Sequence, residues 1–255
     1  MSFNLSRSFF KALKKIELKA ALARGKGYGA SSIQQEVKLT QRFLRCDPKL
    51  AVDVGGNIGE YTAELRRKNP CMEIHIFEPS QVNISKLRAR FTDDALIHLV
   101  PTAVSENSGQ AILFSDQLGS GLGSLSKRKL DHFSIEFNQK EAVKTIRFEE
   151  YWKSHLQSRI IDLVKIDVEG HELSVLNGFG EAIKVTRVIQ FEFGGCNIDT
   201  RTFFQDFWYF FKHYEFDLYR ITPFGTESIR RYDESEEAFR VTNYIAVNRC
   251  LTQCH

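Results

Sequence analysis

Short apolar runs alternate with helical periodicities along most of the chain, and this alternation predicts the fold. Apolar runs predict buried strands at 50–54, 72–79, 95–100, 163–168 and 187–193. Helical patterns are found between or after these runs, at 57–68, 80–91, 172–178 and 200–213. Strands that are apolar throughout and separated by helices indicate a parallel sheet covered by helices on both faces.

Two segments depart from this alternation. The runs at 215–221 and 241–247 have no convincing helix between them, so we expect an antiparallel hairpin to end the sheet. Residues 105–147 hold two strand-like runs around a stretch rich in glycine, serine and lysine. Because this segment follows the third strand, we expect an insertion that reaches the carboxyl edge of the sheet, where such folds bind ligands.

The N-terminal segment has a different pattern. Its apolar residues fall at helical steps of three and four: Leu5, Phe9, Leu13, Ile16 and Ala20. Three glycines between residues 25 and 29 end this helix, and a second helix is expected from about Ser32 to Cys46. The chain therefore divides into a basic arm with its lead-in helix (1–46), one α/β domain (47–250) and a tail (251–255).

Charge is concentrated in the arm. Residues 1–30 carry seven cations and one anion, a net charge of +6, which leaves −3 on the other 225 residues of a chain whose total is +3. The arm either contacts a membrane surface through residues 1–24 or docks on its own domain, and we favour docking because one apolar stripe is common in docked helices. The body has no basic stripe, which argues against a nucleic-acid partner.

Cysteine usage and the N-terminus indicate the compartment. The five cysteines are scattered, without a CxxC pair or zinc-ligand spacing, and are predicted to be reduced thiols. No apolar run approaches the roughly 18 residues that span a bilayer, and the start of the chain does not resemble a signal peptide. We therefore expect a cytoplasmic protein.

The strongest chemical motif is DVGGNIGEYT, from Asp53 to Thr62, where a buried strand enters a glycine-rich turn and then a helix. Such a turn presents backbone N–H groups to a polar ligand, and Asn57 is a good candidate for the helix cap. The spacing differs from the G-x-G-x-x-G of dinucleotide sites. Asp53, just before the glycines, would repel a pyrophosphate and favours a ligand with a cationic amino group.

A carboxylate and an ionisable cluster accompany this turn. Glu78 ends the next strand and is placed to accept hydrogen bonds from two ribose hydroxyls, which indicates a nucleoside ligand. Farther on, LVKIDVEGHELSVLNG places Asp167, Glu169 and His171 at another strand end. Burying such groups is costly unless they are paired or used. Their i, i+2, i+4 spacing would turn all three to one pocket while the chain stays extended, least securely for His171, which follows Gly170.

DVGGNIGEYT, FEPS and KIDVEGHELSVLNG, in this order, resemble the FkbM family of S-adenosylmethionine-dependent methyltransferases over roughly residues 50–195. The resemblance implies a class I methyltransferase fold, a Rossmann-like, mostly parallel seven-stranded sheet with its last strand antiparallel. It implies methyl transfer to a hydroxyl of a sugar or small molecule. It assigns cofactor-binding residues in three motifs: Asp53, Gly55 and Asn57 at the methionine end, with Gly56 and Tyr61 from the same motif, Glu78 at the ribose, and Ala103 and Val104 against adenine. Asp167 would face the reacting centre.

The residues leave the catalytic details open. A hydroxyl acceptor benefits from a general base. His171 has the most suitable intrinsic pKa and Asp167 the best position, while Glu169 and Glu192 are further candidates. Alternatively, the three carboxylates hold Mg²⁺, a hard ion that prefers such oxygens, although we favour no metal.

Three functions are compatible with this site. O-methylation is favoured because the fourth strand lacks a following Asn/Asp-Pro-Pro-aromatic run. Amino-group methyltransferases usually resemble one another through that run. A protein that binds the nucleoside without transferring a methyl group is the first alternative. A nicotinamide-dependent oxidoreductase is the second, and the glycine spacing disfavours it. The acceptor, small molecule or glycan, and the oligomeric state are not determined by the sequence.

Overall fold

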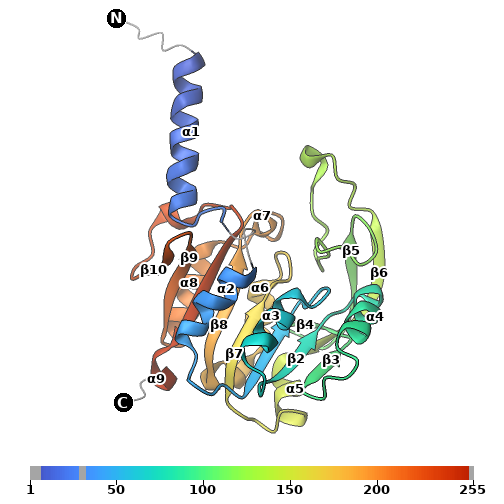
Figure 1. The fold of residues 1–255 in the computed structure, drawn as a ribbon. Coiled ribbons are helices and arrows are strands. Elements are labelled where there is room, and N and C mark those ends of the chain that lie inside the picture. The colour runs from blue at the N-terminus through green and yellow to red at the C-terminus, as the bar shows by residue number, and fades with distance from the viewer. Residues whose placement is uncertain (1–6, 29–32, 253–255) are drawn as a thin grey trace, which may run out of the picture.

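The computed structural model describes residues 7–28 and 33–252, which form a large sheet with helices on both faces and a small sheet beside it (Figure 1). The large sheet has the order β10-β9-β11-β8-β7-β1-β2-β3. Its strands are β1 (Leu50–Val54), β2 (Glu73–Phe77), β3 (Ile97–Val100), β7 (Ile161–Ile166), β8 (Thr186–Phe193), β9 (Phe216–Thr222), β10 (Gly225–Ile229) and β11 (Thr242–Asn248). The expected strand runs are therefore confirmed, with β7 ending at Ile166, before Asp167.

Strand directions give the expected class I methyltransferase sheet. Strands β3, β2, β1, β7 and β8 run parallel, and β11 is antiparallel to both β8 and β9. The antiparallel pairing of the last two predicted strands is confirmed, but β11 enters between β8 and β9, so β9 runs parallel to β8. An eighth strand, β10, pairs with β9 at the edge. It was not predicted because GTESI is polar and short, and only its pairing with β9 makes it a strand.

The helices cover two faces with separate apolar cores. One core packs β1, through Val52 and Val54, against α5 (Phe148–Ser154), α6 (Glu172–Gly178) and α8 (Phe204–His213). The other packs Ala51 against α2 (Ile33–Thr40), α3 (Glu60–Lys68) and α4 (Gln81–Arg90). Alternate residues of a strand face opposite sides, so both faces of β1 are apolar. The aromatic stripe of α8 is therefore core. Short helical segments complete the chain: η1 (Gln41–Phe43), η2 (Asp131–Phe133), η3 (Gly180–Val185), α7 (Cys196–Thr200), η4 (Glu234–Glu236) and α9 (Arg249–Thr252).

The predicted insertion builds the small sheet. Strand β6 (Gln139–Arg147) pairs with β5 (Gly109–Ser115) and with a short strand, β4 (Ala103–Ser105), that precedes the insertion. Figure 1 shows this sheet beside the β3 side of the large one. The segment between β5 and β6 folds back, and Ser124 forms a bridge with Phe114. The insertion is thus held over the carboxyl edge of the large sheet.

The N-terminal helix contradicts the expectation that it docks on its own domain. Helix α1 (Arg7–Ala23) has no buried residue and projects away from the body (Figure 1). Its amphipathic stripe is present from Phe9 onward, while Leu5 and Ser32 lie outside the described residues. Among the described residues, no helix combines the length and apolar character needed to cross a membrane.

Candidate functional site

Two cavities lie side by side at the carboxyl edge of the large sheet, where part of the insertion covers them. The Glu78 cavity is lined by the glycine turn after β1, the end of β2, strand β4 and residues 119–125 of the insertion. The Lys165 cavity, of about 850 Å³, is lined by α2, α3, β7, β8 and β11. Gly55, Asn57 and Asp167 line both, so the two cavities share a wall.

The glycine turn is fixed by close backbone approach. Gly55 has a φ of +85°, and a Cβ on it would lie 1.9 Å from the backbone oxygen of Asp167. Asn57 also has a left-handed φ, +47°, so its prediction as the helix cap is wrong. Gly59 is the N-cap of α3, where a Cβ would come within 2.6 Å of the Phe91 ring. Two residues, Asn57 and Ile58, therefore separate the glycine pair from the N-cap, and Asn57 does not cap the helix.

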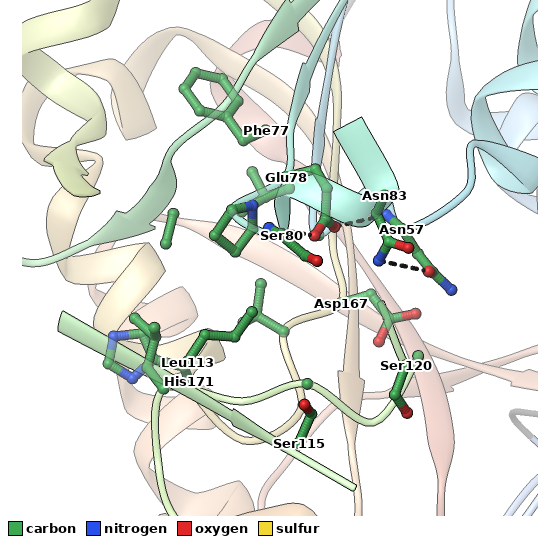
Figure 2. Close-up of a pocket in the computed structure, with 18 of the residues that line it drawn as sticks. Asn57, Phe77, Glu78, Ser80, Asn83, Leu113, Ser115, Ser120, Asp167 and His171 are labelled. Atoms are coloured by element: carbon green, nitrogen blue, oxygen red, sulfur yellow. Dashed lines mark hydrogen bonds between the residues drawn. The ribbon is translucent and has the colours of Figure 1, made fainter. Parts of the chain in front are cut away.

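Glu78 sits as expected at the end of β2. Its carboxylate is 6% exposed and accepts hydrogen bonds from the backbone N–H groups of Asn57 and Ser80, each at 2.9 Å. Burial raises the pKa of this carboxyl to about 7 despite those bonds. Figure 2 shows Glu78, Ser80 and Asn83 grouped on one wall of the cavity. Ser80 Oγ and Asn83 Oδ1 are buried without a partner in the described structure, so this wall offers unused polar atoms to a ligand.

Aliphatic side chains also line the Glu78 cavity. They include Ala103 and Val104 of β4 and Leu113 of β5. The side chains of Ala103 and Val104 are buried, at 7% and 2% exposure. A cavity lined by both polar and aliphatic groups suits a flat, amphipathic group such as a nucleoside. The structure thus places the expected ribose and adenine residues around one space.

The Asp53 carboxylate already has a hydrogen-bond partner within the protein. Its carboxylate is buried beneath the glycine turn and accepts a hydrogen bond from Thr62 Oγ1 at 2.6 Å. Burial raises its pKa to about 6. Asp53 also lines the Lys165 cavity, together with Gly56. Its contact with a methionine end remains a prediction, and its evident role is to brace the turn against α3.

The expected common face of Asp167, Glu169 and His171 is wrong. The strand ends at Ile166, and left-handed φ angles at Glu169 (+53°) and Gly170 (+100°) break the extended alternation. His171 lines the Glu78 cavity (Figure 2), whereas Glu169 lines the Lys165 cavity. The His171 ring bonds Ser105 Oγ at 3.0 Å, and burial lowers its pKa. Of these three residues, only Asp167 lines both cavities.

The Lys165 cavity is built around a buried cation that the prediction omitted. The Lys165 ammonium bonds Asp167 Oδ2 at 3.2 Å and Asn243 Oδ1 at 3.3 Å. Burial lowers its pKa, but the carboxylates of Asp167, Glu36 and Glu192 outweigh that effect, so the pKa is raised and the lysine stays charged. The sequence signal for this buried cation was a lysine inside an otherwise apolar strand. Asn243 and Glu36 come from β11 and α2, and neither had a sequence signal.

Glu192, at the end of β8, faces the same cavity. Its side chain is 8% exposed, and burial, with the neighbouring carboxylates of Asp167 and Glu169, raises its pKa well above the ordinary value. A carboxylate with a raised pKa, open to a cavity, suits a general base for a hydroxyl group. The structure therefore brings together Asp167, Glu169 and Glu192, and separates His171 from them.

Tyr61 does not lie at the Glu78 cavity. Its hydroxyl donates to Gln190 Oε1 at 2.8 Å, and its ring centroid lies 5.7 Å from the Lys165 ammonium. It lines the Lys165 cavity, on the α3 side. The structure therefore groups Tyr61 with the catalytic candidates, apart from the expected ribose and adenine residues.

The carboxylates do not form a magnesium site. At this site, the possible ligand atoms that lie together among the described residues are those of Glu169, Glu192 and Cys196, without Asp167. Glu169 is paired with Arg128 of the insertion at 2.5 Å, and burial raises the pKa of the Cys196 thiol. Mg²⁺ prefers oxygen ligands and octahedral geometry. A guanidinium-bound carboxylate and a protonated thiol do not fit this ion.

Comparisons with known proteins give a family. The model of the methyltransferase FkbM domain matches residues 53–218, well over half of the chain. The chain is 26% identical over 174 residues to 2-O-methyltransferase NoeI of Sinorhizobium fredii (strain NBRC 101917 / NGR234), covering 64% of this chain and 70% of that protein. It is 25% identical over 151 residues to Methyltransferase 1 of Beauveria bassiana (strain ARSEF 2860), covering 53% of this chain and 60% of that protein.

Among solved structures, the O-methyltransferase from Bacillus cereus in complex with SAH aligns with a TM-score of 0.43 and 13% identity. That alignment covers 96% of this chain and 93% of the other. The chain spans less than two thirds of the length of the Beauveria relative and somewhat more of the Sinorhizobium one.

Proposed function

We propose that this chain, which belongs to the methyltransferase FkbM domain family, uses S-adenosylmethionine to methylate a hydroxyl group of a sugar or another small molecule. One observation supports the cofactor: the Glu78 cavity pairs a buried carboxylate and two unpartnered polar atoms with aliphatic side chains. S-adenosylmethionine carries a ribose, an adenine and a cationic amino acid, and its sulfonium would supply the methyl group. The name of one relative, 2-O-methyltransferase NoeI, supports O-methylation.

The residues of both cavities fit this cofactor. Glu78 would accept hydrogen bonds from the ribose hydroxyls, while Ala103 and Val104 would contact the adenine. The turn of Gly55, Gly56 and Asn57 would adjoin the amino-acid end. Because Asp167 lines both cavities, it lies where the methyl group would face the acceptor.

The chain contributes alignment and a proton acceptor to the transfer. The acceptor hydroxyl would occupy the Lys165 cavity, with its oxygen in line with the methyl group and the sulfur. As the oxygen–methyl bond forms and the carbon–sulfur bond breaks, Glu192 would take the hydroxyl proton. Lys165 holds Asp167 by an ion pair and so fixes the carboxylate at the shared wall. His171, neutral and on the adenine side, is left as a positioning residue.

Labelled methyl transfer tests the proposal. Full-length protein is incubated with S-adenosylmethionine that carries a tritiated methyl group and with fractions of candidate sugars and metabolites. Label in an alkali-stable product supports O-methyl ether formation. Binding of the cofactor without transfer to any fraction would instead favour the nucleoside-binding alternative, and binding of NAD in its place would favour an oxidoreductase.

Glu78→Ala is expected to weaken S-adenosylmethionine binding at least tenfold. The substitution removes two charge-assisted hydrogen bonds, each worth about 1.5–3 kcal/mol. Isothermal titration calorimetry measures the affinity, and NAD should not compete in either protein. Glu78→Gln keeps the side-chain volume and should give an intermediate loss. Unchanged affinity in Glu78→Ala, in a protein that melts as the wild type does, would remove the ribose assignment.

Cofactor affinity should rise with pH through about 7. The pKa of Glu78 in the empty protein is about 7, and ribose hydroxyls donate to its ionised form, so binding favours deprotonation. Below that pKa the carboxyl is protonated, which makes affinity about tenfold weaker at pH 6 than at pH 8. Calorimetry across this range provides the measurement. Glu78→Gln should flatten the slope, and an equal slope in that variant would assign the titration to another group.

A further inference from the structure

We propose that α1 docks the protein on an anionic membrane surface by lying in the plane of the interface. The proposal goes beyond the proposed function and does not depend on methyl transfer. It rests on the exposed faces of α1 and on the way in which this helix is joined to the body.

Helix α1 exposes a large apolar stripe. Phe9, Leu13 and Ile16 recur at steps of four and three residues, and their side chains are 42%, 45% and 64% exposed. Phe10, beside the stripe, is 58% exposed. Exposed apolar side chains grouped on one helix mark an interaction surface, because isolated soluble domains rarely leave such groups in water.

The charges of α1 indicate what covers this stripe. Residues Arg7–Ala23 carry five cations, Arg7, Lys11, Lys14, Lys15 and Lys19, and a single anion, Glu17. At 100° per residue, the five cations share the side of the helix opposite the Phe9–Leu13–Ile16 stripe. A basic face joined to an apolar face is the pattern of helices that lie in the interface of anionic membranes, with lysine ammonium groups at the level of the headgroups.

The base of α1 is fixed to the site edge of the sheet. Gly27 N donates to Thr242 Oγ1 at 3.1 Å, and Thr242 pairs with Phe193 at the end of β8. Arg24 pairs with Glu227 at 3.0 Å, and the buried Lys26 side chain lies 3.9 Å from Glu236. A Cβ on Gly25 would meet the backbone oxygen of Ile221, near the end of β9. These contacts tie the helix to the carboxyl ends of β8 and β9.

This attachment lies close to the Lys165 cavity. The residue after Thr242 is Asn243, which pairs with Glu192 across the sheet and lines the Lys165 cavity. Figure 1 shows α1 rising from the same edge of the sheet. The membrane-binding helix therefore joins the body next to the Lys165 cavity.

Vesicle co-sedimentation tests the proposal with the full chain. Vesicles of phosphatidylglycerol and phosphatidylcholine are compared with vesicles of phosphatidylcholine alone, at low and at high salt. We expect sedimentation with the anionic vesicles, and its loss at high salt, where screening shortens the range of the attraction. Lys11→Gln with Lys15→Gln should lower the partition coefficient about thirtyfold. Leu13→Ser with Ile16→Ser should lower it by a similar factor or more.

Matched controls keep the result specific. Lys86→Gln with Lys212→Gln removes the same charge from exposed sites on α4 and α8, and Tyr209→Ser removes an exposed aromatic ring from α8. These variants should bind as the wild type does, and all variants should melt alike because every replaced side chain is exposed. No sedimentation above the lipid-free control would overturn the proposal, as would equal binding to both vesicle types. A dimer that Leu13→Ser with Ile16→Ser dissociates, without vesicle binding, would assign the stripe to a second copy.

Discussion

Glu192→Gln is expected to lower turnover by about 10²–10⁴-fold, the range that a general base contributes, while cofactor affinity stays near the wild-type value. Glutamine keeps the size of the side chain but cannot take the proton of an acceptor hydroxyl. Burial and the carboxylates of Asp167 and Glu169 raise the pKa of Glu192, so the wild-type rate should climb with pH as this group ionises. That acidic limb should be absent from the residual activity of the variant.

The measurement is single-turnover transfer of a tritiated methyl group to the acceptor identified by the labelled-transfer experiment. Calorimetry of cofactor binding accompanies it. His171→Ala is the matched control, because the imidazole lines the Glu78 cavity and not the Lys165 cavity. It should alter cofactor affinity more than turnover. The reverse pattern, a hundredfold slower His171→Ala beside a nearly normal Glu192→Gln, would return the base to the histidine.

Gly55→Ala is expected to lower the free energy of unfolding by about 2–5 kcal/mol. A left-handed φ costs an alanine about 1–2 kcal/mol, and overpacking a tight site typically costs about 1–3 kcal/mol. The added Cβ would stand 1.9 Å from the backbone oxygen of Asp167, so the turn after β1 and the end of β7 must separate. For a chain of this size, the melting temperature should fall by roughly 5–15 °C.

Thermal and urea unfolding measure this loss, and calorimetry should show cofactor binding weakened with it, because the moved turn and Asp167 line both cavities. Gly109→Ala is the control, since a Cβ there meets only Thr145 Oγ1 at 3.8 Å and φ is ordinary. It should stay within about 1 kcal/mol of the wild type. If Gly55→Ala melts with the control, the close approach between the turn and Asp167 is not what requires glycine.

The strands and most helices followed from local pattern. The apolar runs at 50–54 and 187–193 are buried on both faces of the sheet, and such strands need only continuous apolarity to be recognised. The helix predicted at 172–178 has those bounds in the structure. By contrast, GTESI of β10 and AVS of β4 are too short or too polar to signal a strand, and α5 was also not predicted. Their pairing or packing partners, and not their own residues, define them.

The Glu78 cavity was predictable because its residues lie at the carboxyl ends of neighbouring strands, which meet at one edge whatever the rest of the chain does. Glu78, Ala103 and Val104 accordingly line one space. The Lys165 cavity was only partly predictable. Distant segments reach this cavity or its rim: α2 with Glu36, the insertion with Arg128 and β11 with Asn243. No local sequence pattern predicts where such segments lie in the folded protein.

The sequence by itself determined the class of fold, the glycine turn with Glu78 and the family, because strand burial, turn dihedrals and strand-end position are encoded by adjacent residues. Only the tertiary structure decided that His171 parts from Glu169, since two left-handed residues redirect the chain after Ile166. It also decided that α1 stands free of the body. An amphipathic stripe predicts that a helix packs against an apolar surface. Whether the body has an uncovered apolar face depends on what α2 and the rest of the fold already cover.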